Sequence, residues 1–208
     1  GSGTILREAI AAAELLDKDF AVSSDIWSCP SFNELRRDGF DAERWNRLHP
    51  EDEQRVSYVE QCLNGRIGPA IAATDYVRAF ADQIRAFVPM HYTVLGTDGF
   101  GRSDTRSNLR RFFEVDRYYI AHAVIAALAA EGKMSAKDVA RAIKMYNIDA
   151  EKANRITQSK FECVACGYQQ NADINAARNI LAAGLAVIAC GEAVQSDPSA
   201  KQGPTEAI

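Results

Sequence analysis

The sequence predicts an α/β fold in which a mostly parallel sheet carries helices on both faces. Short apolar segments with strand character alternate with amphipathic helical segments through residues 1–152. A glycine-rich loop at residues 96–104 follows one of these strands. Because parallel strands need long crossover connections, which helices usually supply, this alternation is typical of a parallel sheet between two helical layers.

The first elements follow from hydrophobic periodicity. Residues 5–16 carry apolar side chains at helical spacing, which predicts an amphipathic helix. Val22–Cys29 has the composition of a short strand and ends at Pro30. Glu34–Arg37 and Ala42–Leu48 are rich in charges of both signs and predict two short helical pieces.

Two further strands and a helix are predicted in the middle of the chain. Ala70–Ala73 is a short apolar run suited to a buried parallel strand, and Tyr92–Leu95 predicts the third strand. Between them, apolar residues of the segment 77–87 share one helical face. Thr74 or Asp75 is suited to cap that helix.

Two helices close this part of the chain. The first is predicted over Asp116–Glu131, with Gly132 after its end, and the second over Ser135–Tyr146. Ser135 has Asp138 three residues later, the spacing of a capping box. We therefore expect a well-defined start for the second helix.

Composition excludes several classes of protein. The chain has 208 residues, 47% of them hydrophobic, and a net charge of −4, which gives no general attraction to nucleic acid or anionic membranes. Its longest apolar run, Ile180–Cys190, is shorter than the roughly 18–20 residues that span a bilayer. The five cysteines do not form a secreted disulfide pattern, and no signal peptide is visible. We expect a cytoplasmic protein.

The glycine loop allows two interpretations. Its glycines can supply the positive φ angles of a tight turn, or its amides can cradle an anion at a helix N-terminus. The order of Gly96, Gly99 and Gly101 matches neither the dinucleotide fingerprint nor the Walker A loop. Asp98 and Asp104 also place negative charge where a phosphate would bind. We favour the turn.

Several segments of residues 1–152 resemble one enzyme family. That family is the decarboxylating component of homodimeric bacterial pyruvate dehydrogenases, and the resemblance covers only its last domain, the transketolase C-terminal-like domain. The segments that carry it are Ile26–Ser28, Ser31–Arg37, Glu43–Pro50, Thr74–Asp75, Thr93–Arg106 and Asn147–Asp149.

The resemblance implies that the chain carries no catalytic or cofactor-binding residue of the family. In such enzymes thiamine diphosphate and magnesium are held by the upstream domains, which also supply the glutamate that activates the cofactor. The family's metal–diphosphate motif is absent from this sequence, and Thr97–Gly99 only echoes it. The parent enzyme is a homodimer within the pyruvate dehydrogenase complex.

The resemblance also implies a truncated sheet. The family domain has five strands in the order 1-3-2-4-5, and Gly1–Gly3 would correspond to the turn after the second strand. Residues 1–152 would then keep strands 3, 4 and 5 but lack the strand between 3 and 4. Either unpaired backbone groups are exposed at the inner edges, or the strands close up in a new register.

The remaining candidate side chains are predicted to be structural. The three histidines have no nucleophile coupled to them in the sequence, and acid–base catalysis needs a positioned partner. They are His49, His91 and His122. Four arginines are expected to form buried or interfacial ion pairs. They are Arg44, Arg47, Arg102 and Arg106.

The sequence after Lys152 resembles a second family. Phe161–Tyr168 holds a Cys-x-x-Cys pair followed by Gly-Tyr, and Asn171–Asn179 continues into an apolar helical pattern. Together, over about residues 156–192, they resemble the C-terminal tail of the transposon-encoded OrfB nucleases, the ancestors of compact RNA-guided effectors. We predict a short Cys-x-x-Cys knuckle and helix over residues 153–192 and a disordered tail over residues 193–208.

Metal binding in this segment stays open at the level of sequence. Cys163 and Cys166 supply two thiolates, whereas a structural zinc ion takes four ligands. Cys190 lies a full helix away and is a doubtful third ligand. The alternatives are no zinc, zinc bound by one chain, or a site shared between two chains. Asp173 matches one of three carboxylates of the family's RuvC-like metal site, but a single carboxylate favours a helix N-cap.

Two classes of function follow from these resemblances. The first is a structural and dimerisation fragment of pyruvate dehydrogenase that has no chemistry of its own. The alternative is a zinc-binding remnant of a transposon nuclease with residual affinity for nucleic acid. Residues 155–208 have no basic stripe, the usual footprint of nucleic-acid binding, so we favour the first class.

Overall fold

The computed structural model describes residues 1–99, 101, 103–149, 160–162 and 169–171. The chain divides into two units, residues 1–152 and residues 153–208. Within the part of the chain that is described, no helix is long and apolar enough to cross a membrane.

The first unit is built on a two-stranded parallel sheet. Strand β1 (Ala70–Val77) pairs with strand β2 (Tyr92–Thr97), with Ala70 opposite Tyr92. These strands include both apolar runs that the sequence predicts in this region, so the parallel pairing is confirmed. The register shifts between Ala73 and Val77, where β1 bends away from ideal pairing.

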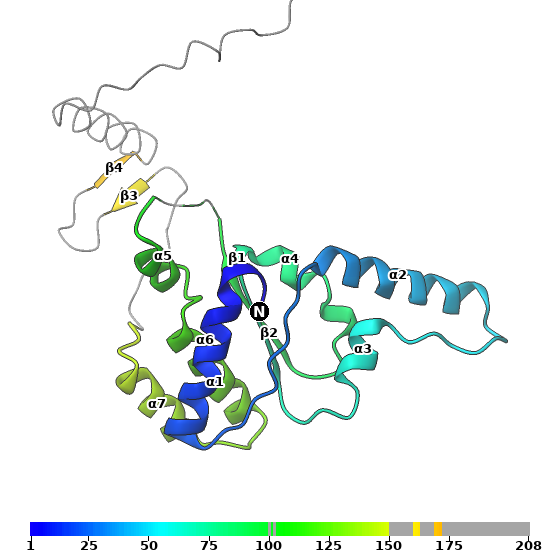
Figure 1. The fold of residues 1–208 in the computed structure, drawn as a ribbon, viewed down its shortest axis with the longest axis horizontal. Helices are drawn as coiled ribbons and strands as arrows, with labels where there is room; N and C mark the ends of the chain where they lie inside the picture. Colours follow the sequence, from blue (N-terminus) through cyan, green and yellow to red (C-terminus); the bar gives the residue numbers. More distant parts are fainter. Residues whose placement is uncertain (100, 102, 150–159, 163–168, 172–208) are drawn as a thin grey trace, which may run out of the picture. The chain divides into compact units, whose positions relative to one another are not determined.

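Helices cover both faces of this sheet (Figure 1). One side carries α1 (Leu6–Phe20), α6 (Arg117–Ala130) and α7 (Ala136–Met145). The other side carries α2 (Phe32–Leu48), α3 (Tyr58–Leu63) and α4 (Arg78–Asp82). Short elements complete the unit: the 3-10 turns η1 (Gly3–Ile5) and η2 (Arg85–Phe87), and helix α5 (Arg106–Phe112).

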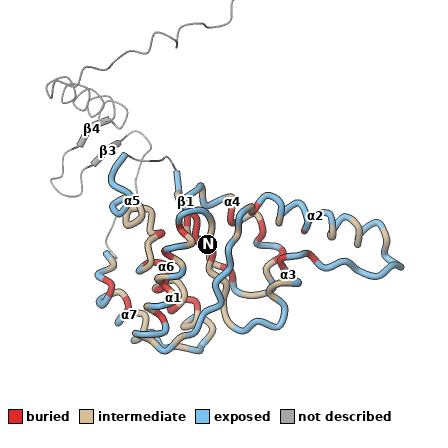
Figure 2. The backbone as a smooth tube through the Cα atoms, in the orientation of Figure 1, coloured by how far each residue is buried: buried red, intermediate tan, exposed pale blue. Residues whose placement is uncertain are grey.

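Two apolar clusters form the core, one on each face of the sheet. Ala73 belongs to the cluster with α1 and α6, whereas its neighbour Ala72 belongs to the cluster with α4 and η2. Successive residues of a strand point to opposite faces, so β1 contributes to both clusters. Buried positions accordingly concentrate along β1 and the helices beside it (Figure 2). The expected helices on both faces are therefore present, around a smaller sheet.

The predicted strand at Val22–Cys29 is wrong. This segment has no strand assignment, and β1 pairs with β2 alone among residues 1–99. The amide of Cys29 instead donates to the carbonyl of Gly1 at 2.9 Å, and the amide of Ser2 donates to the carbonyl of Ala73 at 3.1 Å. Gly1 and Ser2 therefore lie between the segment and β1, and two residues make too few ladder hydrogen bonds to define a strand.

Several helix boundaries also differ from the prediction. The two helical pieces at 34–37 and 42–48 form one continuous helix, α2, capped by the Ser31 hydroxyl. The helix expected after Thr74 begins only at Arg78, because β1 continues to Val77. The Thr74 hydroxyl accepts from the Tyr76 amide at 3.1 Å, a local turn rather than a helix cap. Sequence patterns missed α3 and α5, which have six and seven residues.

The two helices predicted at the C-terminal end of this unit are confirmed. Helix α6 begins after Asp116, whose carboxylate accepts from the amides of Tyr118 and Tyr119. Helix α7 has the predicted capping box, in which Ser135 and Asp138 each accept from the other's backbone amide. Both N-termini are fixed by the side chains that the sequence indicates.

In the second unit, the described residues form one antiparallel pair of strands. Strand β3 (Lys160–Glu162) pairs with strand β4 (Gln169–Asn171), with Phe161 opposite Gln170. The predicted metal ligands Cys163 and Cys166 fall between these strands and lie outside the described residues, as do Asp173 and Cys190.

Candidate functional site

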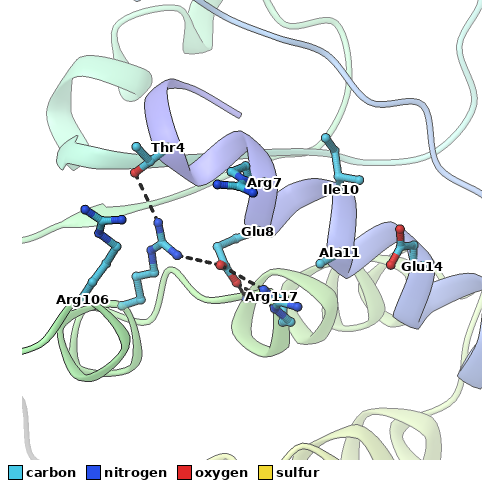
Figure 3. Close-up of a pocket in the computed structure, with 9 residues that line it drawn as sticks. Thr4, Arg7, Glu8, Ile10, Ala11, Glu14, Arg106 and Arg117 are labelled. Atoms are coloured by element: carbon cyan, nitrogen blue, oxygen red, sulfur yellow. Dashed lines mark hydrogen bonds and ion pairs between the residues drawn. The ribbon is translucent and has the colours of Figure 1, made fainter.

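A cavity in the first unit lies between α1, α5 and the start of α6 (Figure 3). It has a volume of about 430 Å³. Four arginines and two glutamates form its charged lining. We call this cavity the arginine pocket. These residues are Arg7, Arg106, Arg110, Arg117, Glu8 and Glu14.

Glu8 is the buried centre of this pocket. It lies in the first turn of α1, and its side chain is only 7% exposed. One carboxylate oxygen accepts from Nη1 of Arg110 at 2.7 Å and from Nη2 of Arg117 at 3.2 Å. The other accepts from Nε and the backbone amide of Arg117 at 2.9 and 3.1 Å. One carboxylate thus ties the end of α5 and the start of α6 to α1.

The ion pairs determine the charge state of Glu8. Burial alone would raise the pKa of this carboxyl group, but hydrogen bonds and positive charge from Arg117, with Arg110, outweigh it and lower the pKa below 4.5. The hydrogen bond to Glu8 is also the main reason that the pKa of Arg117 is raised. The network is therefore fully charged at neutral pH.

The other two arginines of the pocket have no such partner. Arg7 projects from α1 and Arg106 from the first residue of α5, and both are exposed. Among the described residues, neither side chain makes a hydrogen bond or an ion pair. Both line the cavity without an ion-pair partner in the described part of the chain.

The arginines singled out by the sequence have different outcomes. Arg106 lines the pocket but forms no ion pair within the described part of the chain, contrary to the expectation of a buried pair. Arg44 and Arg47 are exposed on α2 and likewise form no ion pair with described residues. An interfacial ion pair stays a prediction for Arg44, Arg47 and Arg106, and Arg102 lies outside the described residues.

Glu8, Arg110 and Arg117 are not among the site residues predicted from the sequence. A signal for Glu8 does exist, because it falls on the buried stripe of α1 with Ile5, Ala12 and Leu16. A carboxylate on an apolar helix face must be paired or neutral. The sequence could therefore have indicated a buried ion pair, although not its partners.

The three histidines lie in separate environments. The Nδ1 atom of His49 lies 3.0 Å from the carbonyl of Trp45, and its ring stacks on the indole. His91 lies 3.3 Å from the Thr93 hydroxyl through Nε2. His122 is on α6, where its buried Nε2 has no hydrogen-bond partner among the described residues, and burial lowers its pKa.

The glycine loop is partly what the sequence predicts. Gly99 has a φ of +72°, as expected for a turn. Gly96 is a strand residue of β2, and a Cβ there would lie 2.8 Å from the Cα of Arg78. Glycine is therefore required at position 96 because two backbones pack closely there, and not because the backbone has a positive φ. Asp104 accepts from the amide of Thr105, the N-cap residue of α5, at 2.6 Å, so its carboxylate lies just before the helix.

The described residues contain no cluster of three or more histidine, cysteine or acidic side chains arranged to hold a metal ion. Cys29 and Cys62, the cysteines within the described ranges, are both free thiols. Burial raises the pKa of Cys29, which makes it a weak nucleophile at neutral pH.

Comparison with known families gives two matches. Residues 1–116 match the transketolase-like TK C-terminal domain. Residues 135–180 match the Cas12f1-like TNB domain. The second match starts at the cap of α7, earlier than residue 156, where the resemblance to the second family is expected to begin.

Individual relatives point to one enzyme. The chain is 62% identical over 154 residues to the pyruvate dehydrogenase E1 component of Cupriavidus necator, covering 74% of this chain and 17% of that protein. The identity to the same component is 60% over 155 residues in Pseudomonas aeruginosa and 54% over 155 residues in Escherichia coli K12. The chain thus spans less than a fifth of the length of these relatives.

Proposed function

The chain belongs to the family of transketolase-like TK C-terminal domains, and from this premise we propose that it is a structural and dimerisation domain derived from pyruvate dehydrogenase E1. The observation that carries the proposal is the 62% identity across 74% of the chain to such a component. In this proposal thiamine diphosphate and magnesium bind to other domains of the parent, a cytoplasmic homodimer within the pyruvate dehydrogenase complex. The domain itself carries no catalytic centre.

The surface of the first unit supports a role in association. Large apolar side chains are exposed on α2 and just after it: Phe40 at 44%, Leu48 at 53% and Val56 at 46%. Tyr58, at the start of α3, is 57% exposed. We call α2 and residues 49–58 after it the arm of the domain. Exposed apolar groups along one such surface are typical of a protein–protein contact. We infer that α2 and the segment after it form the dimer contact.

Sedimentation of the full chain tests this role. We expect a dimer that dissociates in the double variant Phe40→Asp with Leu48→Asp, because each change places a charge in the proposed contact. The matched control is Ile67→Asp, since Ile67 is 94% exposed and lies outside this arm. A monomeric native chain at high concentration would contradict the dimer role. Calorimetric detection of saturable thiamine diphosphate binding would contradict the absence of a cofactor site.

A second candidate function concerns the C-terminal part of the chain. The match of residues 135–180 to the Cas12f1-like TNB domain favours a zinc-binding remnant of an RNA-guided nuclease. In the sequence, Cys163 and Cys166 fall between the paired strands β3 and β4. Two thiolates complete a tetrahedral site only with a second chain or with water. We propose at most weak zinc binding shared between two chains, without cleavage of DNA.

Elemental analysis of size-separated chain tests the zinc proposal. We expect no stoichiometric zinc in monomers, and zinc in dimers that is lost in Cys163→Ser, because a shared site links metal occupancy to assembly. The control variant is Cys62→Ser, which removes a free thiol of the first unit. One zinc ion per monomer that persists in Cys190→Ser would show that a single chain completes the site.

A further inference from the structure

The arginine pocket has more positive charge than its ion pairs balance. Four guanidinium groups and two carboxylates line it, an excess of two positive charges in a cavity of about 430 Å³. The whole chain has a net charge of −4, so this local excess is not a reflection of composition. A concave surface that concentrates one sign of charge attracts ligands of the opposite sign.

The Glu8 network gives the pocket a fixed wall. Arg110 is held at both ends of its guanidinium, with Nη1 on Glu8 at 2.7 Å and Nη2 on the Thr4 hydroxyl at 3.3 Å. Arg117 is held by Nε and Nη2, which leaves Nη1 without an acceptor among the described residues. These side chains lose little further rotamer freedom when a ligand binds.

Arg7 and Arg106 supply the unused donors. Arg7 comes from α1 and Arg106 from α5, so with Arg117 from α6 the donors approach the cavity from three elements (Figure 3). Each guanidinium carries five N–H groups in a planar fork that suits phosphate and carboxylate oxygens. A phosphate monoester presents three strong acceptor oxygens in a tetrahedral arrangement, one more than a planar carboxylate, and so suits donors from three elements better.

We propose that the arginine pocket binds the phosphate group of a small phosphorylated ligand, with Arg7 and Arg106 as its direct contacts. A dianionic phosphate matches the excess of two positive charges. Glu14 lies at the opposite end of the pocket from Arg106 (Figure 3). Its carboxylate disfavours a second phosphate at that end, so the site takes a monophosphate whose neutral part lies along Ile10 and Ala11.

Isothermal calorimetry of the full chain with inorganic phosphate and phenyl phosphate tests the site, at matched ionic strength in chloride. We expect saturable binding of both at one site per chain. The double variant Arg7→Gln with Arg106→Gln should weaken both by at least about tenfold, which corresponds to ~1.4 kcal/mol. Its thermal midpoint without ligand should stay near that of the native chain, because neither side chain has an intramolecular partner among the described residues.

The matched control is the double variant Arg44→Gln with Arg47→Gln, which removes the same charge from exposed positions on α2. It should bind phosphate as the native chain does. Equal weakening in both double variants would show a general charge effect and overturn the proposal, as would the absence of saturable heat. Inorganic pyrophosphate that binds as tightly as phosphate, and no more tightly in Glu14→Gln, would overturn the assignment of a monophosphate.

Discussion

Substitution of Gly96 by valine is expected to lower the free energy of unfolding by about 3 kcal/mol, because overpacking a filled site costs roughly this much. A Cβ at this position would lie 2.8 Å from the Cα of Arg78 and 3.0 Å from Cγ2 of Thr74. The first of these atoms is backbone, so no change of rotamer relieves the clash. Strand β2 would have to separate from the start of α4, which opens the core cluster around Val94.

Gly101→Val is the matched control. No described residue lies within 4 Å of a Cβ built at Gly101. A surface substitution of this kind usually changes stability by less than about 0.5 kcal/mol. Urea denaturation followed by circular dichroism measures both variants. If the two unfold at the same urea concentration, the close approach of β2 to Arg78 does not constrain position 96.

The elements that the sequence predicts correctly are those with local causes. Helices α1 and α7 have apolar periodicity, and helices α6 and α7 have side-chain caps within their own segments. Strands β1 and β2 are apolar runs long enough to be recognised alone. Each of these signals depends on residues within about one or two turns of one another, which is the range that periodicity and capping rules cover.

The errors arise where the outcome depends on distant pairing. Val22–Cys29 has strand composition, but a strand needs a hydrogen-bonded neighbour, and among the described residues only Gly1 reaches the backbone of Trp27 and Cys29. Likewise, β1 extends to Val77 because Val77 lies opposite Thr97 of β2, so the following helix starts later than its cap signals indicate. Pairing partners of this kind are not encoded in the local pattern.

The arginine pocket could be predicted only in part for the same reason. Glu8 is 102 positions from Arg110 and 109 from Arg117, so no sequence spacing brings them together. The resemblance to pyruvate dehydrogenases gives the family of the first unit but assigns no residue of this pocket. The zinc hypothesis rests on Cys163 and Cys166. Both lie outside the described residues, so zinc binding stays a prediction.

Glu8→Gln is expected to lower the free energy of unfolding by about 2 kcal/mol at pH 7, because it leaves two guanidinium groups without their shared carboxylate. The cost is below that of a fully buried pair, since the side chain of Arg117 is 44% exposed and can recover part of its hydration. Glu14→Gln, on the exposed face of the same helix, is the matched control and should cost less than about 0.5 kcal/mol.

The pH dependence of stability distinguishes the contribution of the Glu8 charge from that of its packing. The pKa of Glu8 is lowered in the folded protein, so its stabilisation is complete above its ordinary value of 4.5 and is lost as the pH falls through the lower folded value. The difference in urea midpoint between the native chain and Glu8→Gln should therefore be largest at pH 7 and shrink as the pH falls below 4.5. A difference that stays the same throughout would mean that packing, and not the ion pairs with Arg110 and Arg117, is what Glu8 contributes.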